Sequence, residues 1–156
     1  MKSYFTKKSV GISEDVIFGD NVTVIEPVNL YGCRIGDNTF IGPFVEIQKN
    51  VTIGNRCKIQ SHSFICELVE IGNDCFISHG VMFINDLFQQ GGPAHGDKSL
   101  WKQTVIGNNV SLGTNATILP VSICDNVVVG AGAVVVKNIS VPGIYVGNPA
   151  KLLRKL

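Results

Sequence analysis

The sequence predicts an all-β protein, a parallel β-helix of about six coils with three flat sides. An aliphatic residue recurs every six positions, a small or β-branched residue precedes each by two positions, and a Gly-Asp or Gly-Asn turn often follows. A short strand that ends in a corner explains all three observations, because residues i−2 and i of a strand face the same side. Three such sides close a prism in which one coil takes about 18 residues.

The aliphatic column is unbroken over its longest stretch. It falls at Ile35, Ile41, Ile47, Ile53, Ile59, Ile65, Ile71, Ile77 and Phe83. The column of smaller residues falls at Cys33, Thr39, Val45, Val51, Cys57, Ser63, Val69, Cys75 and Val81. An α-helix would repeat every 3.6 residues and an amphipathic strand every two, so neither explains this spacing. An irregular, Gly-rich β-sandwich is the alternative, and the nine consecutive matches disfavour it.

The aliphatic column extends towards both ends of the chain. Further members are Phe18, Val24, Leu30, Ile106, Leu112, Ile118, Ile123, Val129 and Val135. We therefore expect one domain over residues 1–156, with a loop insertion at about 85–104 and a C-terminal tail at about 148–156. The tail "AKLLRKL" has apolar residues at 152, 153 and 156, which predicts a short C-terminal helix packed on the prism.

The composition limits the class of partner. Charged residues make up 16% of the chain and the net charge is +1, so bulk electrostatics predict no nucleic-acid partner. The longest apolar stretch, Val127 to Val136, contains two glycines and is too short to span a membrane. The amino end "MKSYFTKKSV" has no apolar run after its lysines, so no secretory signal is expected.

The five cysteines, an odd number without a CxxC pair, predict a reducing, cytoplasmic location rather than a disulfide framework. Cys33, Cys57 and Cys75 belong to the inward column of smaller residues, and Cys66 and Cys124 stand where Gly usually stands. We expect all five to pack as small apolar residues rather than to act as nucleophiles.

The repeat breaks between Phe83 and Ile106, where the chain reads "INDLFQQGGPAHGDKSLWKQTV". This segment should leave the prism as a loop, and it carries His95 and the only tryptophan, Trp101. Insertions into repeat proteins often gather on a binding face, so a functional loop is expected. A tolerated surface insertion is the alternative.

Two more histidines fall near this break. His62 lies three residues after Ile59 and His79 lies two after Ile77, so both should project from the same side of adjacent coils. Asn85 comes just round the next corner, and we expect it to converge with the two histidines and the loop into one site. The three histidines are widely spaced, with His95 in the loop, so no metal site is expected.

The repeat, the break at "FIND" and the tail "SLGTNATILPVSICDNVVVGAGAVVVKNISVPGIYVGNPAKLLRKL" resemble the left-handed β-helix acyltransferases. The closer resemblance is to the branch that N-acetylates amino groups of nucleotide-linked deoxysugars, including the N-terminal domains of bifunctional ketoisomerase/acetyltransferases. "GNPAK" is typical of acetyl-CoA-dependent hexapeptide transferases, and "FIND" with Trp101 points to the sugar branch. The segment "ILPVSIC" lacks the Gly of the family's "LPG", which predicts a tightened corner before Ile123.

The resemblance implies left-handed coils and a homotrimer with active sites between neighbouring prisms. It implies acetyl-CoA as co-substrate and a dTDP- or UDP-linked amino-deoxysugar as acceptor, in the biosynthesis of a surface polysaccharide such as lipopolysaccharide O-antigen. It also implies that Asn85, with Asp86 beside it, positions the acceptor. Either His79 or His62 would act as base, unless the amine attacks unaided. His95 and Trp101 would contact the sugar or the nucleotide base, or Trp101 would only anchor the loop.

For CoA, the resemblance points to the later coils, where the long pantetheine arm needs small residues at the corners. Gly113, Ala131 and Gly132 supply such residues. The phosphates of CoA would meet cationic side chains, unless these form only a solvated basic tail. The candidates are Lys137, Lys151 and Arg154. Two other functions stay open: an O-acetyltransferase acting on a sugar, serine or an antibiotic, and a non-catalytic hexapeptide scaffold that would not bind CoA.

Overall fold

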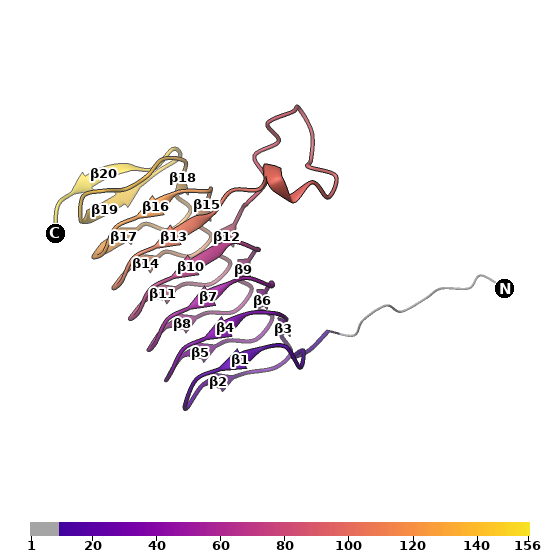
Figure 1. Cartoon of the computed structure of the whole chain (residues 1–156). Helices are drawn as coiled ribbons and strands as arrows, with labels where there is room; N and C mark the ends of the chain where they lie inside the picture. Colours follow the sequence, from indigo (N-terminus) through magenta and orange to yellow (C-terminus); the bar gives the residue numbers. More distant parts are fainter. Residues whose placement is uncertain (1–9) are drawn as a thin grey trace.

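The computed structural model describes residues 10–156. The expectation that the amino end is not a secretory signal concerns residues that lie outside this range, apart from Val10. The chain winds as a three-sided prism of parallel sheets (Figure 1), which confirms the predicted β-helix. The first sheet consists of β1 (Ile17–Phe18), β4 (Arg34–Ile35), β7 (Thr52–Ile53), β10 (Val69–Ile71), β13 (Thr104–Ile106) and β16 (Ser122–Ile123). The second consists of β2 (Thr23–Val24), β5 (Phe40–Ile41), β8 (Lys58–Ile59), β11 (Phe76–Ile77), β14 (Ser111–Leu112), β17 (Val127–Val129), β19 (Gly143–Val146) and β20 (Lys151–Arg154). The third consists of β3 (Asn29–Leu30), β6 (Glu46–Ile47), β9 (Phe64–Ile65), β12 (Met82–Phe83), β15 (Thr117–Ile118) and β18 (Val134–Val135).

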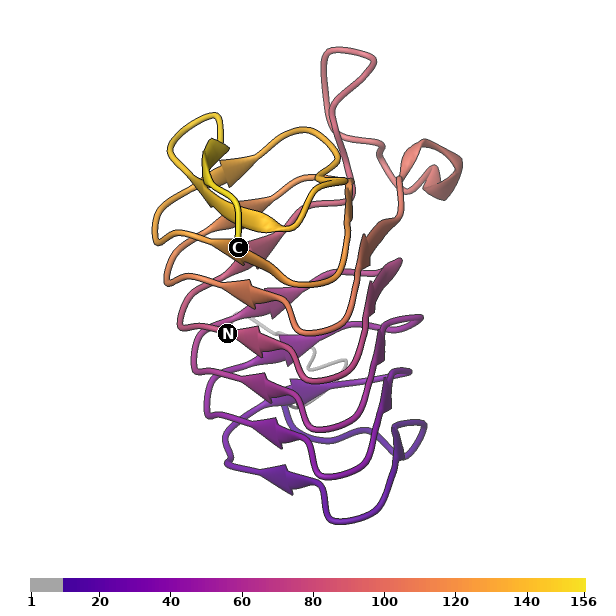
Figure 2. The ribbon, with the colours of Figure 1, turned by 90° about the vertical axis from the view of Figure 1, so that its left-hand side faces the viewer.

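The strand register follows the sequence repeat. Ile41 pairs with Ile59, and Ile59 pairs with Ile77, so equivalent residues of successive coils lie directly above one another. Figure 2 shows the coils stacked along the prism in this way. The first and third sheets have six strands each, which agrees with the six predicted coils, and β19 begins a further turn on the second sheet.

The interior of the prism is the predicted pair of columns. All nine aliphatic positions from Ile35 to Phe83 are at most 3% exposed. At the first coil Phe18 is 38% exposed and Val24 is half-buried, because β1 and β2 are the edge strands of their sheets within the described chain. Burying one such side chain contributes roughly 1.5–3 kcal/mol, so the column is the main source of stability.

The polar members of the inner column bond to the adjacent coil. The Thr39 hydroxyl donates to the Gly54 carbonyl at 2.9 Å, and the Cys57 thiol points at the Gly72 carbonyl at 3.1 Å. All five cysteines are free, and four are buried, as packing residues should be. Burial raises the pKa of the Cys33 thiol to about 11 and that of Cys66 to about 12, which keeps these groups as unreactive thiols.

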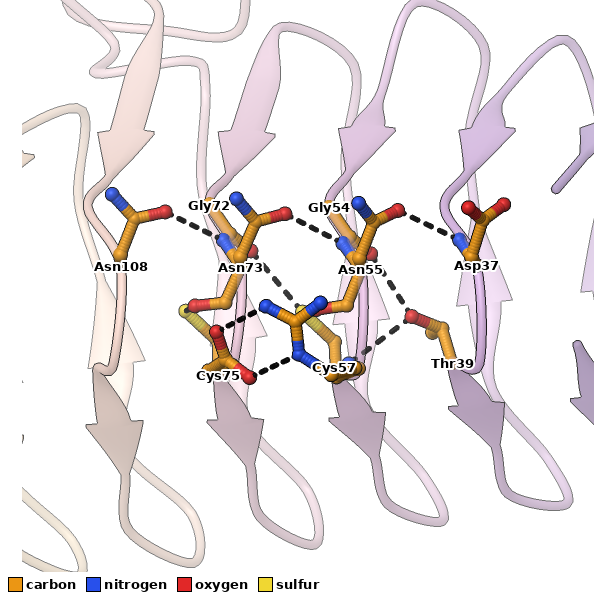
Figure 3. Close-up of polar contacts among 11 residues, drawn as sticks. Asp37, Thr39, Gly54, Asn55, Cys57, Gly72, Asn73, Cys75 and Asn108 are labelled. Atoms are coloured by element: carbon orange, nitrogen blue, oxygen red, sulfur yellow. Dashed lines mark hydrogen bonds and ion pairs between the residues drawn. The ribbon is translucent and has the colours of Figure 1, made fainter. Parts of the chain in front are cut away.

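The edge between the first and second sheets carries the Gly-Asx repeat, and we call it the Asx corner (residues 36–38, 54–56, 72–74, 107–109 and 124–126). The side-chain oxygen of Asn73 accepts from the Asn55 N–H at 2.8 Å, and the same bond recurs in the neighbouring coils (Figure 3). The preceding glycines leave room for this ladder: a Cβ on Gly54 would lie 2.6 Å from both the Asn73 side-chain oxygen and the Gly72 carbonyl. The glycines of the Gly-Asx pairs therefore allow adjacent coils to approach each other closely at this corner.

Two details of the last coils concern the sequence predictions. Ile123 pairs with Ile106, so the spacing between these paired residues is one less than the 18 between Ile41 and Ile59. The corner between β15 and β16 also has no residue of positive φ, whereas equivalent corners contain Asn50 and Leu68 in that conformation. This is the tightened corner expected at "ILPVSIC". The C-terminal helix is wrong, because the tail instead forms β20, antiparallel to β19. A strand satisfies the unpaired edge of β19, whereas a seven-residue tail is too short for a stable helix.

We predict that Gly54→Ala lowers the free energy of unfolding by about 1–3 kcal/mol, because the new methyl group must displace the next coil. Urea denaturation followed by circular dichroism measures this. Gly92→Ala is the matched control, since no atom lies within 4 Å of its missing Cβ, and it should stay within about 0.5 kcal/mol of wild type. Equal stability of the two variants would contradict the close approach of the coils.

We also predict that iodoacetamide at pH 8 labels Cys124 first, because it alone of the five cysteines is half-buried rather than buried. The other four should react only in denaturant. Mass spectrometry of tryptic peptides after native and denatured labelling measures this. Rapid native labelling of Cys57 or Cys75 would show that the prism interior is open.

Candidate functional site

Two further edges of the prism carry the candidate residues. The edge from the second to the third sheet, which we call the histidine corner, comprises residues 60–62, 78–80, 113–115 and 130–132. The edge from the third to the first sheet, the loop corner, comprises residues 48–50, 66–68, 84–103 and 119–121. The long loop projects from the loop corner between β12 and β13 (Figure 1) and contains the 3-10 helix η1 (Lys98–Leu100).

The two histidines lie on adjacent coils at the histidine corner, as predicted. The Gly80 N–H donates to the Ser61 carbonyl at 3.0 Å, which holds the coil of His79 directly on that of His62. Both side chains are exposed. The expected convergence with Asn85 is wrong for a single chain, because strand β12 separates the two histidines from the loop corner. The histidines and Asn85 lie at opposite edges of the third sheet.

The surroundings of the two histidines differ. The His62 ring stacks on the Phe44 ring, with 4.9 Å between centroids and 12° between planes. His79 is one coil nearer to the small residues of the same corner, and its carbonyl accepts from the Asn115 N–H at 2.9 Å. The structure therefore distinguishes two histidines that the sequence left unranked: the ring of His62 is already in contact with an aromatic neighbour.

The predicted small residues share the histidine corner with His79. A Cβ on Gly113 would lie 2.5 Å from the Ala131 nitrogen, so the two coils meet closely there. Gly132 has a φ of +68°, and nothing lies within 4 Å of its missing Cβ, so the backbone is open to contact. The upper histidine corner, residues 113–115 and 130–132, thus places the small residues Gly113, Ala131 and Gly132 on the coils above His79.

The predicted cations are distributed over two places. Lys151 and Arg154 are exposed on β20, beyond a turn whose Ala150 N–H donates to the Val134 carbonyl at 2.8 Å. This turn lies at the upper end of the histidine corner. Lys137 follows β18 and so lies on the side of the loop corner, apart from the small residues.

The loop corner carries a second group of predicted residues. Asn85, Asp86 and Trp101 line a hollow of about 360 Å³. The other lining residues are Gln48, Phe64, Cys66, Phe83, Ile84 and Phe88. The Asp86 carboxylate accepts from the N–H groups of Phe88 at 3.0 Å and Ala94 at 2.7 Å, which folds the loop on itself. His95 is exposed and does not line the hollow.

Sequence reasoning missed one charged pair at this corner. Glu67, only 8% exposed, accepts from the Lys98 ammonium with both carboxylate oxygens at 2.9 Å. Lys98 also lies 5.0 Å from the centroid of the Trp101 ring. The hydrogen bond to this carboxylate raises the pKa of the Lys98 ammonium, so Lys98 keeps its positive charge at neutral pH. The only signal in the sequence for this contact is a spacing: Glu67 lies 18 positions before Asn85, which places it one coil below.

The described residues offer neither a metal-binding cluster nor a membrane-spanning helix. Within residues 10–156, no group of three His, Cys, Asp or Glu side chains is arranged to hold a metal ion. The same residues contain no helix of the length and apolar character that crossing a membrane requires.

Comparison with known proteins supports the fold. Residues 32–67 match the model of the bacterial transferase hexapeptide (six repeats), and residues 103–137 match the hexapeptide repeat of succinyl-transferase. The chain is 31% identical over 147 residues to the bifunctional protein GlmU of Streptococcus uberis, covering 92% of this chain. It spans 31% of that relative's length.

Two solved structures share the architecture. AntD, an N-acyltransferase from Bacillus cereus in complex with dTDP and 3-hydroxybutyryl-CoA, superposes with a TM-score of 0.77 at 23% identity, over 99% of this chain and 90% of that one. A maltose O-acetyltransferase from Clostridium difficile 630 gives a TM-score of 0.55 at 25% identity, over 90% and 71% of the two chains. The repeat matches and the three-sided prism identify the chain as a hexapeptide-repeat β-helix, the architecture that it shares with these two acyltransferases.

Proposed function

We propose that this protein transfers the acetyl group of acetyl-CoA to the amino group of a dTDP- or UDP-linked amino-deoxysugar. The observation that carries the proposal is the ordered loop, which places Asn85, Asp86 and Trp101 around one hollow. A mainly apolar hollow that carries an amide and aromatic rings suits a sugar ring and a flat base. The likeness to AntD, whose structure contains dTDP and an acyl-CoA, supports this choice.

In this proposal the complete site forms between copies of the chain. His79 and Asn85 lie at opposite edges of the third sheet, so one prism cannot bring both to one reacting atom. A closed homotrimer with a head-to-tail interface would place the histidine corner of one prism against the loop corner of the next. Each of the three interfaces then holds one site.

The acyl donor would lie along the upper histidine corner. Gly113, Ala131 and Gly132 would let the pantetheine arm approach the backbone, with the thioester near His79. Lys151 and Arg154, exposed beyond the top of this corner, would meet the phosphates through charge-assisted hydrogen bonds. Lys137 lies on the side of the loop corner, so it would contact only the CoA phosphates bound to a neighbouring prism.

The reaction needs a neutral amine. Its lone pair attacks the thioester carbonyl, the carbonyl oxygen carries the negative charge of the tetrahedral intermediate, and CoA leaves as thiolate. Asn85 would hold the acceptor, and His79 would take the proton that the amine nitrogen loses. His79 is preferred to His62 because it is nearer to the small residues and because Phe44 already stacks on His62.

An O-acetyltransferase is the second candidate, favoured by the likeness to the C. difficile maltose O-acetyltransferase. A hydroxyl acceptor would fit the same corners, but it is far less nucleophilic than an amine and would depend wholly on the base. The amino-sugar proposal includes a cytoplasmic location, where acetyl-CoA is supplied, and a role in making a surface polysaccharide such as lipopolysaccharide O-antigen. A scaffold without CoA binding would show no thermal stabilisation by acetyl-CoA.

We predict that the protein releases free CoA thiol from acetyl-CoA when a dTDP- or UDP-amino sugar is present. A spectrophotometric thiol assay over a panel of such sugars measures this. The matched controls are the same nucleotide sugars with a hydroxyl in place of the amine. Release with the hydroxyl sugars alone would favour the O-acetyltransferase, and no release with any acceptor would defeat the proposal.

We predict that His79→Ala lowers kcat by about 10²–10⁴-fold, because the base is lost. His62→Ala is the matched control at the same corner and should lower kcat less than about tenfold. Asn85→Ala should raise the KM for the sugar while the KM for acetyl-CoA stays unchanged. Steady-state kinetics at saturating co-substrate measures all three. If His62→Ala proves the more damaging variant, the base has been assigned to the wrong histidine.

A further inference from the structure

The loop buries few of its side chains. Of residues 84–103, only Ala94 is buried, while Leu87 and Phe88 are 38% and 59% exposed. Apolar packing therefore contributes little to its position. Polar contacts with the coil below must hold it, and most of these go to a single residue, Glu67.

Glu67 contacts the loop in two ways. Its backbone carbonyl accepts from the Asn85 side-chain N–H at 3.2 Å, and its carboxylate accepts twice from the Lys98 ammonium at 2.9 Å. Its own N–H donates to the Gln48 side-chain oxygen at 3.2 Å, which fixes it to the next coil down. Glu67 therefore fixes both the start of the loop and its 3-10 helix to the prism.

Because the Glu67 carboxylate is largely buried, it depends on a cationic partner, which Lys98 provides. The side chain is 10% exposed, whereas that of Lys98 is 49% exposed. A carboxylate withdrawn from water is unfavourable unless a cation or several donors satisfy it. Lys98 provides that cation from the loop and at the same time lies against Trp101. Removal of either partner should therefore release the 3-10 helix and Trp101 together.

The same contacts orient Asn85. With one side-chain N–H held by the Glu67 carbonyl, the amide plane is fixed, and its oxygen accepts from no donor among residues 10–156. The Lys102 N–H donates to the Asn85 backbone carbonyl at 2.9 Å, which joins the two ends of the loop beside this amide. Asn85 also lines the hollow, so its amide oxygen is available there to accept an N–H from a ligand amine.

We propose that Glu67 is a positioning residue for acyl transfer, because with Lys98 it holds the loop so that Asn85 and Trp101 face the acceptor. This inference rests on the proposed function, since it assigns the acceptor to the hollow at the loop corner. Glu67 does not touch the reacting atoms. Its effect reaches the reaction through the orientation of Asn85 and through the stacking surface of Trp101.

The first test uses the single tryptophan and needs no activity. Glu67→Gln keeps the size and the backbone of the residue but removes the charge that binds Lys98, and Lys98→Met removes the cation. Both variants should increase the acrylamide quenching constant of Trp101 about twofold or more, whereas Lys98→Arg should leave it near the wild-type value. Unchanged quenching in Glu67→Gln would overturn the proposed attachment of the loop.

Glu70→Gln is the matched control. Glu70 also joins the prism to the loop region, through a 2.7 Å bond from the Gln103 side chain, but it contacts neither Asn85 nor Trp101. This variant should leave quenching and turnover unchanged. If it changed both as strongly as Glu67→Gln, loosening of any loop contact would explain the result and the special role of Glu67 would be refuted.

The second test separates positioning from stability. In Glu67→Gln and Lys98→Met the KM for the sugar should rise about tenfold, the KM for acetyl-CoA should stay unchanged, and the double variant should be no worse than either single one. Thermal unfolding of the prism should shift little. Equal loss for both substrates, or full additivity, would contradict the proposal. Lack of thiol release by the wild-type protein would refute the proposed function instead, and the quenching result would then stand on its own.

Discussion

The stacking of one coil on the next, in a register that repeats with the sequence, is the constraint on which the rest of the structure depends. Interior aliphatic side chains such as Ile41, Ile59 and Ile77 lie in one column, and each coil donates its backbone N–H groups to the carbonyls of a neighbour. The Asx corner adds a side-chain bond at each level. Because every level repeats the same contacts, the position of any corner residue follows from its place in the repeat.

That regularity explains which features the sequence could predict. The interior columns, the coil count, the loop and the tightened corner before Ile123 follow from spacing, since a shift by one residue would turn apolar side chains outward. The tail was mispredicted because "AKLLRKL" has a helical pattern, while the free edge of β19, which pairs with it, appears only in three dimensions. Local pattern could not reveal an edge formed by another part of the chain.

The candidate site was predicted in part for the same reason. The pairing of His62 and His79, and the small residues above them, follow from coil spacing. The convergence with Asn85 failed because a single repeat, about six residues, turns the chain through one corner and moves it to the other edge of the third sheet. Glu67 and Lys98 were missed because the loop has no repeat, so no spacing rule could bring Lys98 back to the prism.

Together these features describe a rigid prism whose candidate residues lie along two edges. The contacts with the acyl donor are proposed on one edge and the contacts with the sugar acceptor on the other.

Mixing the variants His79→Ala and Asn85→Ala tests this arrangement most directly. If the site forms between copies of a trimer, unfolding and refolding equal amounts of the two variants together should restore about one quarter of wild-type activity at a sugar concentration well below the KM of Asn85→Ala, because one site in four then receives both intact residues. Activity no higher than that of the separate variants would contradict a shared site.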